Sequence, residues 1–121
     1  METTKLLTAV LVFASTSVFA QVPGALDPSF SGDGMVTTHF APIGSDFAMG
    51  VAIQPNGRIV AVGSTQQDLV TSVALARYLP DGTLDPDFGT GGQVITAIGV
   101  DPVLISDVAM AVALQPDGKI V

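Results

Sequence analysis

The sequence contains no cysteine and no tryptophan, and only four of its 121 residues are basic, against eleven acidic ones. Without cysteine, disulfide bonds, thiolate metal sites and a cysteine nucleophile are excluded. The formal net charge is −7 and the basic residues are scattered, so the chain has no cluster of cations to displace counterions from phosphate groups. We therefore expect neither nucleic acid nor an anionic lipid surface as a partner.

The chain also has no apolar run of the ~20 residues that are needed to span a bilayer. Its first twenty residues, METTKLLTAVLVFASTSVFA, combine one lysine, a short apolar stretch diluted by serine and threonine, and small side chains at Val18 and Ala20. This order is typical of a secretory signal peptide that is cleaved before Gln21. We predict a signal peptide over residues 1–20. The mature chain, 21–121, is then secreted, periplasmic or at the cell surface, without an integral membrane segment.

What the sequence does contain is a repeat. LDPSF at Leu26–Phe30 returns as LDPDF at Leu84–Phe88, 58 positions later. SDFAMGVAIQPNG at Ser45–Gly57 returns as SDVAMAVALQPDG at Ser106–Gly118, 61 positions later. The three extra residues fall in a connection after Thr96 that contains proline and glycine, as expected for a loop between strands of fixed length.

Within the repeat the hydrophobic pattern has a period of two, which predicts strands rather than helices. In the segment 47–53 large apolar side chains alternate with small ones, so we expect the large ones to share one face and the small ones the other. The large residues are Phe47, Met49, Val51 and Ile53, and the small ones are Ala48, Gly50 and Ala52. A strand of this kind is buried on both sides, and its small face lets a neighbouring sheet approach closely.

Three Pro-(Asn/Asp)-Gly sequences predict tight turns, because proline presets the first corner and glycine accepts a positive φ. They are Gln54-Pro55-Asn56-Gly57, Leu79-Pro80-Asp81-Gly82 and Gln115-Pro116-Asp117-Gly118. We expect strands at Phe47–Ile53, Arg58–Ser64 and Val70–Leu79, and a short fourth strand at Met35–Thr38 in the first unit and Gln93–Ala97 in the second. The predicted fold class is all-β, with antiparallel β-meander repeats that are like propeller blades.

The stretches LDPSFSGDGMVTT, VAIQPNGRIVAVG, VALARYLPDGTLDPDFG and VALQPDGKIV resemble the delta-60 repeat family over nearly the whole mature chain. The resemblance implies a β-propeller-like fold in exported or surface-attached bacterial proteins, usually with many copies of the unit. It implies no established activity and no catalytic residues.

One blade cannot bury both of its faces, so neighbouring repeats are needed for packing. The first unit, about 24–83, is complete, whereas the second, about 84–121, stops within a strand. We therefore expect an incomplete propeller of about one and a half units and a fragment of a longer protein. Alone, such a chain is predicted to fold marginally, with the large apolar face of residues 47–53 exposed.

The aspartates are the only crowded functional groups. Asp81, Asp85 and Asp87 place three carboxylates within seven residues, and carboxylate oxygens suit Ca²⁺. Their spacing is not that of an EF-hand loop, so they are weak candidates, and we expect Asp81 and Asp85 to bend the chain as Asx residues. Arg77 is expected to pair with Asp85 or Asp107 and tie neighbouring strands together.

His39, the only histidine, has no serine, cysteine or ligand partner at a suggestive spacing, so a surface or packing role is favoured over catalysis. The sequence therefore indicates no catalytic residue and no cofactor. It favours a non-catalytic exported scaffold, or a binding module for a protein or carbohydrate ligand of unknown identity. Two alternatives stay open: a secreted hydrolase or lyase with its active site in other blades of a complete ring, and a Ca²⁺-stabilised repeat protein.

Overall fold

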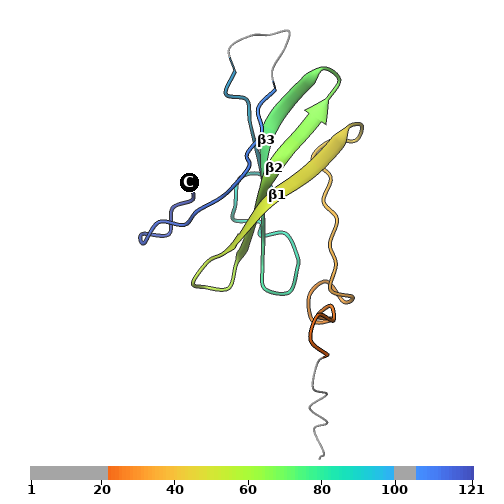
Figure 1. The fold of residues 1–121 in the computed structure, drawn as a ribbon, viewed down its shortest axis with the longest axis vertical. Coiled ribbons are helices and arrows are strands. Elements are labelled where there is room, and N and C mark those ends of the chain that lie inside the picture. The colour runs from red at the N-terminus through yellow and green to blue at the C-terminus, as the bar shows by residue number, and fades with distance from the viewer. Residues whose placement is uncertain (1–21, 100–105) are drawn as a thin grey trace, which may run out of the picture.

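The computed structural model describes residues 22–99 and 106–121 (Figure 1). These residues form one antiparallel sheet with the strand order β1-β2-β3-β4. Its strands are β1, Ser45–Ile53; β2, Ile59–Gln67; β3, Val70–Tyr78; and β4, Gln93–Thr96. No helix occurs in the described residues, so the predicted all-β meander is confirmed. The predicted signal peptide lies outside these residues. Within them, the structure contains no helical segment that is able to cross a membrane.

The predicted turn at residues 54–57 joins β1 to β2. The amide of Gly57 donates to the carbonyl of Gln54 at 2.8 Å, and the amide of Gln54 donates to the carbonyl of Arg58 at the same distance. Gly57 has a φ of 81°, a conformation that costs a residue with a Cβ atom about 1–2 kcal/mol. The Pro-Asn-Gly sequence therefore sets this hairpin locally, as its turn chemistry predicts.

A β-bulge at Met49 corrects the predicted alternation along β1. Phe47 pairs with Ser64 and Ala48 with Gly63, but Gly50, and not Met49, pairs with Val62. Because directly paired residues point to the same side of a sheet, the extra residue exchanges the two faces of the strand at this point. Ala48 thus shares its face with Val51 and Ile53, and Phe47 shares its face with Gly50 and Ala52. The prediction that all the large side chains lie on one face is wrong.

The fourth strand of the sheet also differs from the prediction for the first unit. Met35–Thr38 is not a strand in the structure, because its place beside β3 is taken by β4, which pairs Gln93 with Ala76 and Thr96 with Val73. The sheet therefore runs from residue 45 to residue 96, across the boundary between the two sequence units. A repeat period gives the length of a blade but does not give its starting point.

Segments of both sequence units cover the two faces of the sheet. Residues 36–40 lie on the face of Ala74, Ala76 and Tyr78, all of which are buried. Residues 106–113 lie on the opposite face, where the buried side chains of Val60 and Val62 point. Figure 1 shows the orange N-terminal segment and the blue C-terminal segment on opposite sides of the sheet. The core is thus the pair of central strands between two extended segments.

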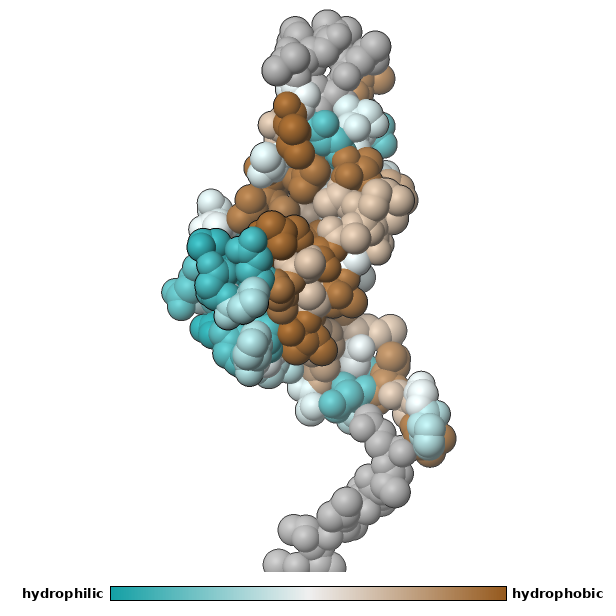
Figure 2. Space-filling model, turned by 60° about the vertical axis from the view of Figure 1, so that its left-hand side comes forward, coloured by the Kyte–Doolittle hydropathy of each residue, from teal (hydrophilic) through white to brown (hydrophobic). Residues whose placement is uncertain are grey.

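β1, at the free edge of the sheet, keeps its large side chains in solvent. Phe47 is 55% exposed and Ile53 is 68% exposed, and Met49 and Val51 are exposed as well. Figure 2 shows apolar side chains gathered in the middle of the molecule, next to a polar region. The predicted exposure of the large side chains of residues 47–53 is confirmed, although the bulge distributes these side chains over both faces.

Candidate functional site

The most densely bonded polar group in the described residues is the carboxylate of Asp85, which is only 1% exposed. Its Oδ2 atom accepts hydrogen bonds from Nε of Arg58 at 2.7 Å and from Nε of Arg77 at 2.9 Å. Its Oδ1 atom accepts a hydrogen bond from the amide of Asp87 at 3.1 Å. The predicted pair of Arg77 with Asp85 is confirmed, and Arg58 is a second partner that the sequence analysis missed.

The strands bring these residues together. Val60 pairs with Arg77 across β2 and β3, so Arg58, two residues before Val60, projects from the same face as Arg77. The amide of Asp85 donates to the carbonyl of Arg77 at 2.8 Å, which fixes the aspartate beside the end of β3. The guanidinium of Arg77 also lies 4.5 Å from the ring centre of Phe88, within the range of a cation–π contact.

Burial raises the pKa of Asp85, but the amide of Asp87 and the guanidinium groups of Arg58 and Arg77 more than offset this effect. The pKa of Asp85 therefore lies below its ordinary value, and the carboxylate is ionised at neutral pH. Because two guanidinium groups and an amide bind this carboxylate, its role is structural: it holds β2, β3 and the connection to β4 together. Arg58 directly follows the Pro-Asn-Gly turn and directly precedes β2, the strand next to β3. This position in the sequence could have indicated that Arg58 is a second partner of Asp85.

The three aspartates considered for Ca²⁺ do not converge. The carboxylate of Asp81 accepts hydrogen bonds from the amide and the hydroxyl of Thr83, at 2.9 Å and 2.6 Å, as expected for a turn residue. Asp85 is enclosed by the arginines, and the structure groups no set of three possible metal ligands among the described residues. Asp107, the other partner considered for Arg77, instead accepts from the amides of Ile98 and Gly99.

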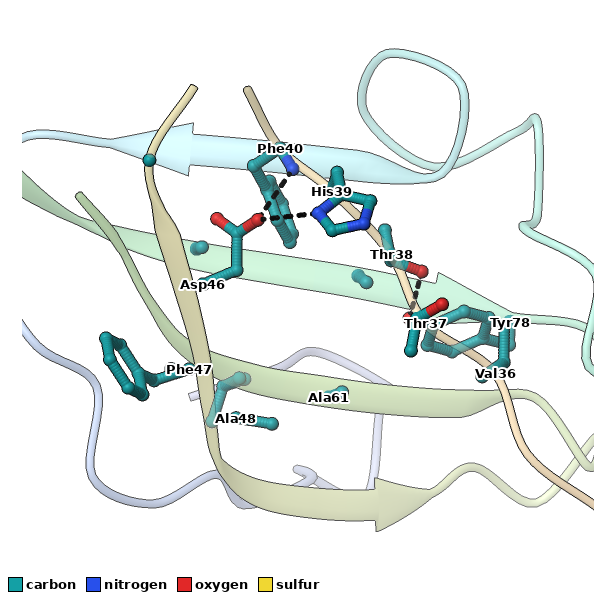
Figure 3. Close-up of a pocket in the computed structure, with 15 residues that line it drawn as sticks. Val36, Thr37, Thr38, His39, Phe40, Asp46, Phe47, Ala48, Ala61 and Tyr78 are labelled. Atoms are coloured by element: carbon teal, nitrogen blue, oxygen red, sulfur yellow. Dashed lines mark hydrogen bonds and ion pairs between the residues drawn. The ribbon is translucent and has the colours of Figure 1, made fainter. Parts of the chain in front are cut away.

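A cavity of about 370 Å³ lies between residues 36–40 and the sheet (Figure 3). Its floor is made of small side chains of the central strands, Ala61 and Ala74 among them. At one end the hydroxyl groups of Thr38 and Tyr78 are hydrogen-bonded at 2.7 Å, and Nε2 of Gln93 donates to the carbonyl of His39 at 3.1 Å. These bonds hold the N-terminal segment across the sheet and leave a gap beneath it.

Asp46 lies at the other end of the cavity. Its Oδ2 atom accepts from the amide of Phe40 at 3.2 Å and lies 3.7 Å from Nδ1 of His39 (Figure 3). Its Oδ1 atom is buried and has no hydrogen-bond partner among the described residues. The His39 side chain is 83% exposed, and no hydroxyl in the described part of the chain bonds to its ring. The cavity therefore combines an apolar floor with a carboxylate that has one buried oxygen without a hydrogen-bond partner in the described residues.

A four-stranded antiparallel meander is the unit from which propeller blades are built. Residues 54–88 match a family described as a domain of unknown function (DUF5122) beta-propeller. The matched stretch contains β2 and β3 together with Arg58, Arg77 and Asp85. No curated protein and no solved structure matches the chain. The match and the sheet together support a β-propeller repeat, with the described sheet as one blade-like unit.

Proposed function

We propose that this chain is a non-catalytic repeat module of the delta-60 type, from an exported protein in which neighbouring blades pack into a scaffold or a binding surface. The proposal is carried by the contrast between its polar and apolar groups. The buried carboxylate of Asp85, paired with the partly exposed Arg58 and Arg77, holds strands together, while large apolar side chains of β1 remain in solvent. A module of this kind is stabilised by contact with further modules.

The export part of the proposal rests on the first twenty residues, whose order of lysine, short apolar stretch and small residues suits cleavage before Gln21. The proposed ligand is a protein or a carbohydrate, and the sequence has no cluster of cations for a nucleic acid. N-terminal sequencing of protein recovered from the periplasm or medium is expected to start at Gln21. A chain that keeps Met1 in the cytoplasm would contradict export.

Packing between modules is tested by adding one. The mature chain, residues 21–121, is compared with the same chain extended beyond Val121 by residues 61–105 of its own sequence, which completes a second unit. We expect the extension to raise the thermal midpoint by roughly 5 °C or more and to reduce the binding of an apolar dye such as ANS. A sharp transition without dye binding in the unextended chain, unchanged by the extension, would contradict the proposal.

A further inference from the structure

The loop at residues 26–34 shares three hydrogen bonds with the loop at residues 84–92. The two loops differ in the sign of φ only at their third- and second-last positions, where Gly32 and Gly91 have a positive φ and their counterparts Thr90 and Asp33 do not. In the first loop the amide of Phe30 donates to the carbonyl of Asp27 at 3.0 Å, and the corresponding bond from Phe88 to Asp85 is 3.1 Å. Two further hydrogen bonds of the first loop have counterparts in the second. The amide of Gly34 donates to the carbonyl of Phe30 at 2.7 Å, and the amide of Gly92 donates to that of Phe88 at 2.8 Å. The amide of Ser29 donates to Oδ1 of Asp27 at 2.9 Å, and the amide of Asp87 donates to Oδ1 of Asp85 at 3.1 Å. The part of each loop that carries the aspartate, residues 26–31 and 84–89, is therefore folded in the same way.

The two loops also share a φ value that is energetically unfavourable for the residue in the first loop. Ser31 and Gly89, which correspond to each other, both have a φ of 55°. A left-handed conformation is ordinary for glycine but disfavoured for serine. The first loop thus holds its shape against a local penalty, helped by a 2.7 Å hydrogen bond from the amide of Ser31 to the carbonyl of Asp81. The shape does not depend on arginine contacts, because only the second loop has them.

The two loops differ in what surrounds Oδ2 of the aspartate, the carboxylate oxygen that does not bond within the loop. Oδ2 of Asp85 is enclosed by Arg58 and Arg77. Asp27 is exposed, and no basic side chain pairs with it in the described part of the chain. The hydroxyl and the amide of Ser29 hold the pKa of Asp27 below its ordinary value, so its free oxygen carries charge at neutral pH.

The residues that follow the first loop are unpaired as well. Residues 35–38 are extended but make no backbone-to-backbone hydrogen bond within the described residues, whereas the corresponding β4 is paired with β3. Met35 is 58% exposed. An extended segment with free backbone groups is a template for pairing with another strand.

We propose that residues 26–38 form a docking site for a three-stranded antiparallel sheet of the same repeat type, one that carries a basic side chain at each of the positions of Arg58 and Arg77. Oδ2 of Asp27 accepts hydrogen bonds from this basic pair, and the unpaired segment lies along the third strand of the incoming sheet. The partner is identified by charge complementarity. In the second loop the aspartate binds two arginine side chains, so we expect the aspartate of the first loop to bind basic side chains as well. The inference rests on the proposed role as a repeat module.

The test builds such a sheet onto the chain itself. The mature chain is extended beyond Val121 by residues 61–83 only, which completes three strands with Lys119 at the position of Arg58 but supplies no aspartate loop for them. The loop of a second copy is then the available partner, so we expect this chain to associate in sedimentation experiments. The chain extended by residues 61–105 brings its own loop and is the matched control, which is expected to stay monomeric.

Two substitutions separate this contact from non-specific adhesion. Asp27→Asn is expected to weaken association at least about tenfold, whereas Asp87→Asn, an exposed aspartate of the other loop, changes it by less than about threefold. Equal effects of the two substitutions overturn the proposal. A monomeric chain also overturns it, whether or not the added strands are folded, because the proposed contact is what completes them. In either case a stabilising effect of the longer extension would leave the repeat-module function standing.

Discussion

Two hairpins of this chain, residues 45–60 and 106–121, have nearly the same sequence and very different structures. Both form the same turn: the amide of Gly57 donates to Gln54 at 2.8 Å, and the amide of Gly118 donates to Gln115 at 2.9 Å. Only the first continues into regular strands, however, and the second has a single bridge between Leu114 and Ile120. The turn is therefore a local property of the sequence, and the strand is not.

The difference lies in what each hairpin contacts beyond itself. β2 pairs with β1 on one side and with β3 on the other, and Arg58 reaches Asp85, 27 residues further along the chain. In the second hairpin the corresponding Lys119 pairs with Asp117, two residues away. A basic residue at this position ties strands together only where a third strand and the aspartate loop are present. The comparison thus indicates that the sheet is stabilised by β3 and by the Asp85 cluster, which consists of Asp85, Arg58 and Arg77.

The largest effect is expected from removing the charge of Asp85, which would make the first hairpin resemble the second. Asp85→Asn leaves two partly buried guanidinium groups without a counter-charge, and removing the buried partner of such ion pairs lowers the thermal midpoint of a small domain by roughly 10 °C or more. Circular dichroism melting of the mature chain measures this. Asp81→Asn is the control, since its exposed carboxylate serves only its own turn. Similar losses in both variants would show that the cluster does not hold the sheet.

Acid is expected to act on the same cluster more gradually. The pKa of Asp85 is lowered from an ordinary value of 3.8, so its contribution to stability is complete above that pH and is lost as the pH falls through the folded-state pKa. Thermal midpoints measured between neutral pH and pH 3 should therefore fall mainly below about pH 4. The Asp85→Asn chain should show a shallower fall, due to the exposed aspartates whose pKa values are also lowered, such as Asp27 and Asp81. Parallel curves for the two chains would contradict this role of Asp85.

The features that sequence reasoning predicted are those set by nearby residues. The Pro-(Asn/Asp)-Gly turns follow from the allowed φ values of proline and glycine, and strands close to β2 and β3 were expected next to these turns. The bulge at Met49 was not predictable in this way, because it depends on how β1 meets Gly63, where an added Cβ atom would collide with the carbonyl of Phe47. Nor was the identity of the fourth strand, since residues 35–38 and 93–96 carry similar patterns and only the fold decides which one reaches β3.

In the candidate site, too, contacts between residues close in sequence were predictable and contacts between distant residues were not. Arg77 and Asp85 lie eight residues apart across one turn, so their pairing was predictable from the chain. Arg58 joins them only through the register of β2 with β3, in which Val60 lies opposite Arg77. The cavity under residues 36–40 likewise depends on contacts between segments that are distant in sequence, such as the bond of Thr38 with Tyr78. No local pattern marks contacts of this kind.

The smallest effect is expected from the pair of substitutions Gly57→Ala and Gly118→Ala, and it tests the comparison most directly. The two glycines have φ values of 81° and 85°, so alanine costs about 1–2 kcal/mol of local conformational energy in each turn. At Gly57 this cost falls on the hairpin that belongs to the sheet, and the added Cβ atom also lies 3.2 Å from Cγ of Pro80. The thermal midpoint should fall by several degrees.

At Gly118 the same cost falls on a hairpin that is outside the sheet, and an added Cβ atom has no neighbour within 4 Å. We expect Gly118→Ala to leave the midpoint of the main transition within about 1 °C while speeding hydrogen exchange at the amides of Ala113 and Val121, which pair with each other's carbonyls. Equal losses of midpoint for the two variants would mean that the second hairpin unfolds together with the sheet. The contacts of residues 106–113 with β2 and β3 would then be sufficient to make the second hairpin part of the cooperative unit of the sheet.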